Sequence, residues 1–273
     1  MGTGVRNSVR AIPERFVDAE SSESTAPIVP TIVVGTWKGG AWKTSISTSL
    51  AERLAFTGAN VLLLTTDDQE DAKARLGVEG EAGPTTVSRG TGTVVVVGAR
   101  GSVAVDLLYR TGAHEYGKID LVVVDTPPIL QGGSLPGVLL VCPIDGKDAA
   151  RNAVLFLRKM PATSLPILVR VGSNDSPKDW EYSAETIGKA IGRDVAFLAA
   201  PVPTSETIKE AQNDGVSVYD CARRGHTLAF VNAIEAIARA AWTHAYGEND
   251  VMPALPKKRG KVYIPGWDDE DAS

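Results

Sequence analysis

The sequence predicts a single α/β domain in which a doubly wound, mostly parallel β-sheet is flanked by helices. Short runs of apolar and β-branched residues recur along the chain, and helical patterns lie between most of them, which is typical of alternating strands and helices. A glycine-containing loop directly follows the first of these runs. In sheets of this class the ligand site lies at the C-terminal ends of the strands, so we expect the functional residues to gather there.

The first strand, loop and helix open the domain. Residues 31–34 (TIVV) form a β-branched run. Apolar residues at helical spacing follow at Ile46, Leu50 and Leu54. Gly58 ends this helix, and residues 61–64 (VLLL) resume as a fully apolar run, typical of a strand that is covered on both faces. The unit is complete within about 35 residues, the usual size of a β-α-β unit.

Further strands and a closing helix follow from the same reasoning. Apolar runs that we expect to be strands cover residues 94–97, 121–124, 138–141, 167–171 and 195–198. The last strong helical pattern runs roughly from Thr227 to Ala245 and is expected to close the core.

The two ends of the chain have a different composition. Residues 1–30 contain few apolar residues, and residues 247–273 are polar and rich in proline and charge. Segments of this kind cannot bury enough apolar surface to fold by themselves. We therefore expect a flexible N-terminal arm over residues 1–30, one domain over 31–246, and a flexible C-terminal tail over 247–273.

Composition excludes several classes of protein. The formal net charge is −5, so any contact with DNA must come from a local basic patch; candidates are Arg151, Arg158, Lys159, Arg223 and Arg224. The cysteines, Cys142 and Cys221, form no CxxC pair, which argues against a disulfide framework or a thiolate metal site. No apolar stretch of about 20 residues is present. We expect a cytoplasmic protein with no membrane partner.

The most informative segment is residues 38–45 (KGGAWKTS), between the first strand and the first helix. A loop in this position directs backbone N–H groups and the helix N-terminus at phosphate oxygens. Lys43 is expected to neutralise phosphate charge and Thr44 to coordinate Mg²⁺, which predicts a phosphate-containing ligand bound together with Mg²⁺. The residues expected to contact the nucleotide here are Gly39, Gly40, Ala41, Trp42, Lys43, Thr44 and Ser45.

This segment resembles the deviant Walker A motif, KGGxGKT, of the ParA and MinD family of ATPases. The resemblance implies that Lys38 reaches across a dimer interface to the partner's nucleotide, so that two subunits enclose two ATP molecules. Residues 61–69 (VLLLTTDDQ) and 119–128 (IDLVVVDTPP) are similar to two further family motifs. The match implies that Asp125 orients Mg²⁺ ligands and that Asp67 supports hydrolysis by positioning the attacking water.

Two further parts of the resemblance lie in the second half of the domain. Residues 202–220 are similar to a family stretch that ends EAxxxGxPVxxYD. Asn174 falls where the family recognises the nucleotide base. The resemblance therefore covers residues 31–245.

Two departures from the family pattern fall in the site itself. Trp42 replaces the glycine before the lysine, a position that often requires a backbone conformation reached by L-residues only at a cost of about 1–2 kcal/mol. Thr65 replaces an aspartate, and its hydroxyl brings no charge to the metal. We expect Thr65 to weaken metal binding. For Trp42 the sequence leaves three outcomes open: weaker nucleotide binding, an indole that stacks outward, or a change in which nucleotide fits. Lys38, Lys43, Thr44, Asp67 and Asp125 are all in place.

Two functions follow from the resemblance. The first is a slow, partner-stimulated ATPase that dimerises on ATP, binds DNA non-specifically as a nucleoid-associated protein, and segregates or positions cargo with a ParB-like or other adaptor protein. The second is a non-hydrolysing adaptor or filament scaffold with the same fold, suggested by Trp42 and Thr65. The sequence leaves the cargo and any polymerisation open.

Overall fold

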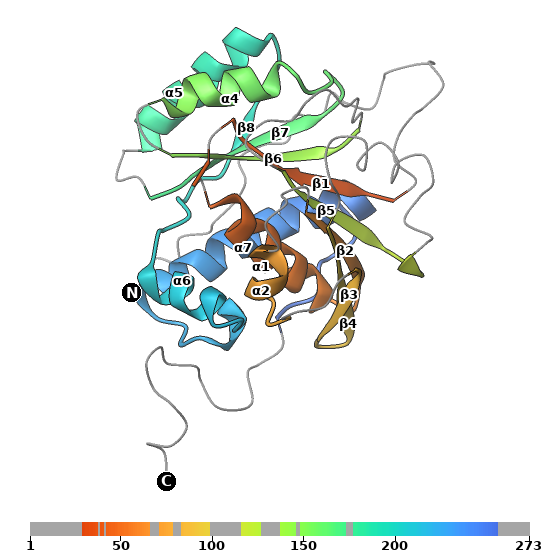
Figure 1. Cartoon of the computed structure of the whole chain (residues 1–273). Helices are drawn as coiled ribbons and strands as arrows, with labels where there is room; N and C mark the ends of the chain where they lie inside the picture. Colours follow the sequence, from red (N-terminus) through yellow and green to blue (C-terminus); the bar gives the residue numbers. More distant parts are fainter. Residues whose placement is uncertain are drawn as a thin grey trace.

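The computed structural model describes residues 29–37, 39–40, 42–65, 71–78, 83–98, 116–126, 137–145, 148–172 and 177–255. Its centre is an eight-stranded sheet with the order β3-β4-β2-β5-β1-β6-β7-β8 (Figure 1). The strands are β1 (Thr31–Val34), β2 (Asn60–Thr65), β3 (Thr85–Arg89), β4 (Gly92–Gly98), β5 (Leu121–Asp125), β6 (Leu139–Ile144), β7 (Leu165–Arg170) and β8 (Ala196–Phe197).

All neighbouring strands pair in parallel except β3 and β4, which form an antiparallel hairpin at one edge. The predicted doubly wound, mostly parallel sheet is therefore confirmed. The hairpin was not predicted from the sequence, because β3 has an alternating burial pattern and no apolar run. Such a half-buried strand gives a weaker signal than a strand covered on both faces.

Helices cover both faces of the sheet (Figure 1). The helices are α1 (Lys43–Ala55), α2 (Asp71–Arg75), α4 (Ala149–Leu157), α5 (Pro177–Ile191), α6 (Glu206–Asn213) and α7 (Gly225–Tyr246), with a 3₁₀ turn at Val218–Asp220. Helices α4 and α5 lie on one face, and α1, α2, α6 and α7 lie on the other. No helix in the described ranges is long and apolar enough to cross a bilayer.

The sheet divides the apolar interior into two clusters, one beneath each layer of helices. On one face Leu50 and Leu54 of α1 pack with Phe230 of α7, and all three are fully buried. On the other face Phe156 of α4 and Ile187 of α5 pack against the sheet. The first cluster holds α1 in place, and α1 in turn positions the loop that precedes it.

The chain after α7 continues along the same face. Residues 247–255, where the sequence was expected to begin a tail, are mostly exposed, but Met252 is buried and the Pro253 carbonyl accepts a hydrogen bond from Arg53 Nη2 at 2.7 Å. The physical reason for this contact is a buried guanidinium that needs acceptors near the end of α1. Residues 1–28 and 256–273 lie outside the described residues.

Candidate phosphate-binding site

The loop between β1 and α1 begins at a close backbone approach. Gly35 donates its N–H to the Val141 carbonyl at 2.9 Å. A Cβ at Gly35 would lie 2.4 Å from the Phe156 ring, so any larger residue would displace the loop. Gly40 then takes φ +70°, a conformation that glycine adopts without strain. These two glycines set the path of the chain between the strand and the helix.

Helix α1 begins without a side-chain cap. Its N-cap residue is Trp42, whose side chain makes no capping hydrogen bond, and the first turn contains no acidic residue. The first intrahelical bond runs from the Ile46 N–H to the Trp42 carbonyl at 2.9 Å. The N–H groups of Lys43, Thr44 and Ser45 precede that bond and have no partner within the helix. Together with the positive end of the helix dipole, they form an arrangement suited to an anion.

Trp42 adopts the backbone conformation of the glycine that it replaces. Its φ is +59° and its ψ is +17°, and it is the only non-glycine residue with positive φ among the described residues. The indole is half-buried, with its centroid 6.2 Å from the ring of Phe230 on α7, and Lys209 Nζ of α6 lies 6.0 Å from the indole centroid. The side chain thus packs toward α6 and α7, and this packing offsets the strain of about 1–2 kcal/mol in the backbone.

The neighbouring strands β5 and β2 end at Asp125 and Thr65. These two residues lie at the C-terminal ends of the strands, as the β1–α1 loop does. They are register partners between β5 and β2, and both are buried. Ser47 Oγ lies 3.1 Å from Asp125 Oδ1 and 2.9 Å from the Lys43 carbonyl oxygen, so that its one proton is shared between these two acceptors. This links the carboxylate to the first turns of α1. Lys43 itself is only 8% exposed.

The Mg²⁺ that the resemblance implies can be tested against this chemistry. Mg²⁺ in nucleotide sites is usually held by one or two carboxylates, a hydroxyl and the substrate phosphates. Asp125 and the Thr44 hydroxyl fit such a donor set. Within the described ranges, no group of three or more His, Cys, Asp or Glu side chains is placed to hold a metal ion.

Sequence reasoning missed three side chains that the structure places beside the loop. Ser47 lies one turn after Lys43 on α1. Arg75 of α2 and Gln212 of α6 reach the same turn from elsewhere in the chain: Arg75 Nη1 donates to Ser45 Oγ at 3.0 Å and to Gln212 Oε1 at 2.7 Å. The spacing of Ser47 offered a signal in the sequence, but nothing in the sequence brings Arg75 or Gln212 to Ser45.

Several predicted site residues cannot be placed. Lys38, Ala41, Asp67 and Asn174 lie outside the described residues. Among the remaining residues, the structure brings together Gly39, Gly40, Trp42, Lys43, Thr44, Ser45 and Asp125 at the C-terminal edge of the sheet.

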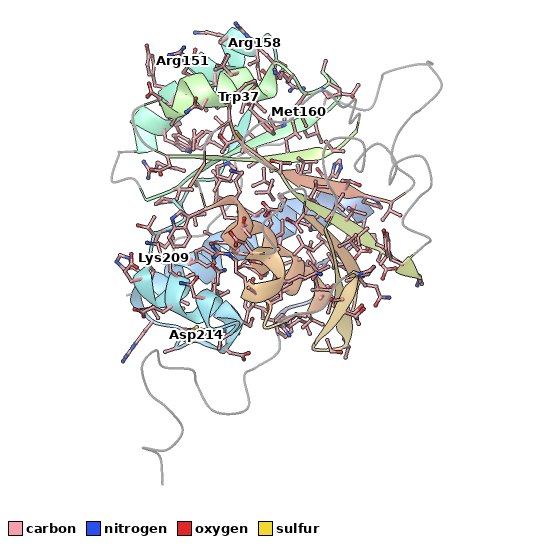
Figure 2. The ribbon with its side chains drawn as sticks, viewed as in Figure 1. Trp37, Arg151, Arg158, Met160, Lys209 and Asp214 are labelled. Carbon is pink, nitrogen blue, oxygen red and sulfur yellow. The ribbon has the colours of Figure 1, made fainter. Side chains whose placement is uncertain are left out.

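The candidate DNA-binding residues fall into two separate groups. Arg151, Arg158 and Lys159 are exposed on or just after α4 (Figure 2), and Lys159 Nζ lies 4.1 Å from the centroid of the Trp37 ring. Arg223 and Arg224 are exposed just before α7. Because α4 and α7 cover opposite faces of the sheet, the two groups do not form one basic patch.

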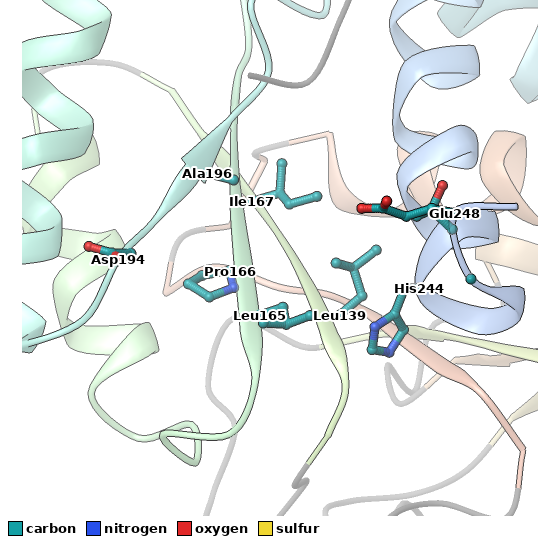
Figure 3. Close-up of a pocket in the computed structure, with 10 residues that line it drawn as sticks. Leu139, Leu165, Pro166, Ile167, Asp194, Ala196, His244 and Glu248 are labelled. Atoms are coloured by element: carbon teal, nitrogen blue, oxygen red, sulfur yellow. The ribbon is translucent and has the colours of Figure 1, made fainter. Parts of the chain in front are cut away.

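A hollow lies at the N-terminal ends of β6 and β7 (Figure 3), away from the β1–α1 loop. It has a volume of about 210 Å³ and is lined by the first residues of β6 and β7 together with Asp194, His244 and Glu248. Burial lowers the pKa of His244, although a hydrogen bond with the Gly137 backbone acts in the opposite direction. With two carboxylates and a histidine whose pKa is lowered by burial, this hollow is unsuited to phosphate.

Comparisons with known proteins address the fold. No protein-family model matches the chain, and no curated protein matches it. Among solved structures, apo McdA from Cyanothece is 17% identical with a TM-score of 0.56, covering 77% of this chain and 99% of its own. MinD from Pyrococcus horikoshii, complexed with Mg-ADP, is 16% identical with a TM-score of 0.55, covering 80% of this chain and 100% of its own.

A third neighbour is an enzyme of biosynthesis. Cobyrinic acid a,c-diamide synthase from Mycobacterium smegmatis, with bound ADP and magnesium, is 19% identical with a TM-score of 0.52, covering 84% of this chain and 100% of its own. The sheet and the glycine loop before α1 therefore define a single-domain α/β protein of the P-loop NTPase fold. Within that class the fold is the one seen in MinD and McdA, so the ParA and MinD resemblance is confirmed at the level of the fold.

Proposed function

We propose that this protein is a Mg²⁺-dependent ATPase that works as a nucleotide-switched dimer. The observation that carries the proposal is the N-terminus of α1, where main-chain N–H groups that precede the first intrahelical bond lie with Lys43 and Thr44 beside the buried carboxylate of Asp125. An NTP binds there through main-chain amides, as in other sites at helix N-termini. The neighbours bound to nucleotide and magnesium have the same fold, which supports ATP and Mg²⁺ as the cofactors.

In this proposal catalysis is mainly electrostatic positioning. The Lys43 ammonium and the amides of α1 hold the phosphates, and Thr44 and Asp125 hold the magnesium. The metal supplies charge neutralisation at the transferred phosphoryl group when it is bound. Lys38 of one subunit contacts the nucleotide of the other, Asp67 orients the attacking water, and Asn174 contacts the base.

The biological role is a proposal of the same kind. The ATP-bound dimer binds DNA or another scaffold non-specifically, and a ParB-like or cargo adaptor protein accelerates hydrolysis and releases it. The N-terminal arm, residues 1–30, or an adjacent face is the proposed contact for that partner. Because the candidate basic residues lie on two faces, each group is to be tested separately as a DNA contact, and binding by either should weaken steeply with salt.

A second candidate is a non-hydrolysing adaptor or filament scaffold. Trp42 and Thr65 favour it: the first holds a strained conformation in the loop, and the second leaves the register position opposite Asp125 without a charge. Binding of ATP and ADP, measured by calorimetry, separates the two candidates. Undetectable binding of both nucleotides favours the adaptor.

The ATPase proposal is tested by measuring phosphate release with and without duplex DNA. We expect slow release from the wild type and a reduction of at least about 100-fold in Lys43→Ala, because the lost cation contacts charge that builds up in the transition state. Lys189→Ala is the matched control, since this lysine is 74% exposed and pairs with Glu185 of its own helix. Equal release from the wild type and Lys43→Ala would refute the proposal.

A further inference from the structure

A second cation points at the first turn of α1 from a different helix. Arg75 ends α2 and is half-buried. Its Nη1 group donates to Ser45 Oγ at 3.0 Å. Ser45 carries one of the three amides that precede the first intrahelical bond of α1. The guanidinium of Arg75 is therefore hydrogen-bonded to a residue, Ser45, whose amide is proposed to contact phosphate.

Gln212 fixes the guanidinium in this position. Its Oε1 accepts from Arg75 Nη1 at 2.7 Å, and its Nε2 donates to Ser49 Oγ at 3.3 Å and approaches the Ser45 carbonyl at 3.4 Å. Gln212 is only 2% exposed. A buried amide that contacts both Arg75 and α1 restricts the freedom of the arginine, so less entropy is lost when a ligand binds.

The backbones of α2 and α6 meet just beyond these side chains. A Cβ at Gly77 would lie 2.7 Å from the Gly215 carbonyl oxygen, and a Cβ at Gly215 would lie 2.5 Å from Gly77 Cα. Two glycines are therefore needed for the turns after α2 and α6 to pack this closely. The close contact holds Arg75 and Gln212 on the same side of α1.

Charged groups of both signs lie around Ser45. The positive end of the α1 dipole, Lys43 and Arg75 gather there, and the first turn of α1 contains no acidic residue. Burial lowers the pKa of Arg75, while the carboxylates of Asp71 and Asp125 act in the opposite direction. Arg75 therefore adds a second cationic side chain, beside Lys43, on the side of α1 where the proposed phosphate groups would lie.

We propose that Arg75 is a second protein cation of the phosphate site, which acts through Ser45 and replaces part of the charge neutralisation that Mg²⁺ supplies. This inference rests on the proposed nucleotide site. The ligand class is a nucleoside di- or triphosphate. Its consequence is that nucleotide binding depends less on Mg²⁺ in the wild type than in a variant that lacks the Arg75 charge.

The test compares ATP affinity in EDTA and in saturating Mg²⁺ for the wild type, Arg75→Gln and Arg75→Lys. The quantity of interest is the factor by which Mg²⁺ tightens binding. We expect this factor to be about tenfold larger in Arg75→Gln, the effect of losing one charged hydrogen-bonding group. Arg75→Lys keeps the charge and should stay within about threefold of the wild type. Arg239→Gln, an exposed arginine on α7, is the control.

The outcomes separate this inference from the one on which it rests. Wild-type protein that binds no ATP in either condition overturns the proposed nucleotide site and this inference with it. If the wild type binds ATP and the Mg²⁺ factor is unchanged in Arg75→Gln, this inference alone is overturned. That result includes an equal loss of ATP affinity in EDTA and in Mg²⁺, which is what a purely structural role of Arg75 predicts. If Arg75→Gln fails to fold, Arg75→Met, which keeps the aliphatic stem, takes its place with the same expected factor.

Discussion

At the scale of single residues, Trp42 combines two opposing contributions to stability. Its positive φ strains the backbone, and its indole packs between Phe230 and Lys209. If the indole packs away from the phosphate groups, removing it should change stability more than nucleotide affinity.

Two substitutions at Trp42 separate strain from packing. Trp42→Ala loses the packing and keeps the strain, whereas Trp42→Gly loses both. We expect Trp42→Gly to be more stable than Trp42→Ala by about 1 kcal/mol, the cost of the left-handed conformation, and both to be less stable than the wild type. Urea denaturation measures the free energies of unfolding. A Trp42→Ala protein as stable as Trp42→Gly would show that the strain is absent.

Glu52 of α1 gives the fold a pH dependence. It is buried, and it accepts hydrogen bonds from Arg89 Nε at 2.6 Å and from Ser217 Oγ at 3.0 Å. Burial raises the pKa of Glu52 above its ordinary value of 4.5, and Arg89 only partly offsets this. The folded state then holds the proton more tightly than the unfolded state. The contribution of this group to stability is therefore fully present below pH 4.5 and declines as the pH rises through the folded-state pKa.

The prediction for Glu52→Gln follows from that sign. The glutamine variant has no titrating group at this position, so the difference in free energy of unfolding, wild type minus variant, should fall as the pH rises from about 4.5 towards 7. Urea denaturation at a series of pH values checks it. A difference that rises with pH would mean that the ion pair with Arg89 outweighs the burial of the carboxylate.

Part of the site could be predicted from the sequence, and part could not. Lys43 and Thr44 were recognisable because a phosphate loop is a local motif, in which contacts and sequence spacing coincide. Arg75 and Gln212 approach Ser45 from separate helices. Their positions depend on how α2 and α6 pack together, which no local pattern encodes.

At the scale of elements, α1 and α7 are joined by a charged group inside the domain. Arg53 is fully buried, and its guanidinium bonds to both carboxylate oxygens of Glu235 on α7 and to the Pro253 carbonyl. A buried ion pair adds little net stability, but removing one partner leaves an uncompensated charge. This pair therefore makes the position of α1 sensitive to a single change on α7.

Glu235→Ala is expected to lower the free energy of unfolding by about 3–5 kcal/mol, because the Arg53 guanidinium stays buried without its carboxylate. The matched control is Arg239→Ala, which removes the other partner of Glu235. Arg239 is 55% exposed and bonds to Glu235 Oε1 at 2.8 Å, so its loss should cost at most about 1 kcal/mol. Thermal or urea denaturation of both variants tests the contrast. Similar losses in the two would show that burial of Arg53 is unimportant.

The elements themselves differed in how well the sequence predicted them. Residues 31–34 and 61–64 were recognisable as strands because both faces are covered and their residues are β-branched or apolar throughout. The β3 strand and the short α2 helix were not, since one lies at a sheet edge and the other spans Asp71–Arg75 with few apolar residues. Both depend on tertiary contacts with β4, α1 and α6.

At the scale of the whole molecule, the account requires two copies of the chain to meet over ATP. The resemblance to ParA and MinD assigns the contact across the interface to Lys38. In Mg²⁺ and a non-hydrolysable ATP analogue, we expect the molar mass from light scattering to double in the wild type. Lys38→Ala should bind the analogue and remain a monomer, whereas Lys43→Ala should not bind it. Dimers of Lys38→Ala would contradict the proposed role of Lys38.

The central claim is that a triphosphate binds at the N-terminus of α1. The most direct test is a crystal structure of the full chain with Mg²⁺ and a non-hydrolysable ATP analogue. The account predicts phosphate oxygens on the amides of Lys43, Thr44 and Ser45, with the Trp42 indole still against Phe230. An indole that occupies the space above these amides, with no nucleotide bound there, would contradict it.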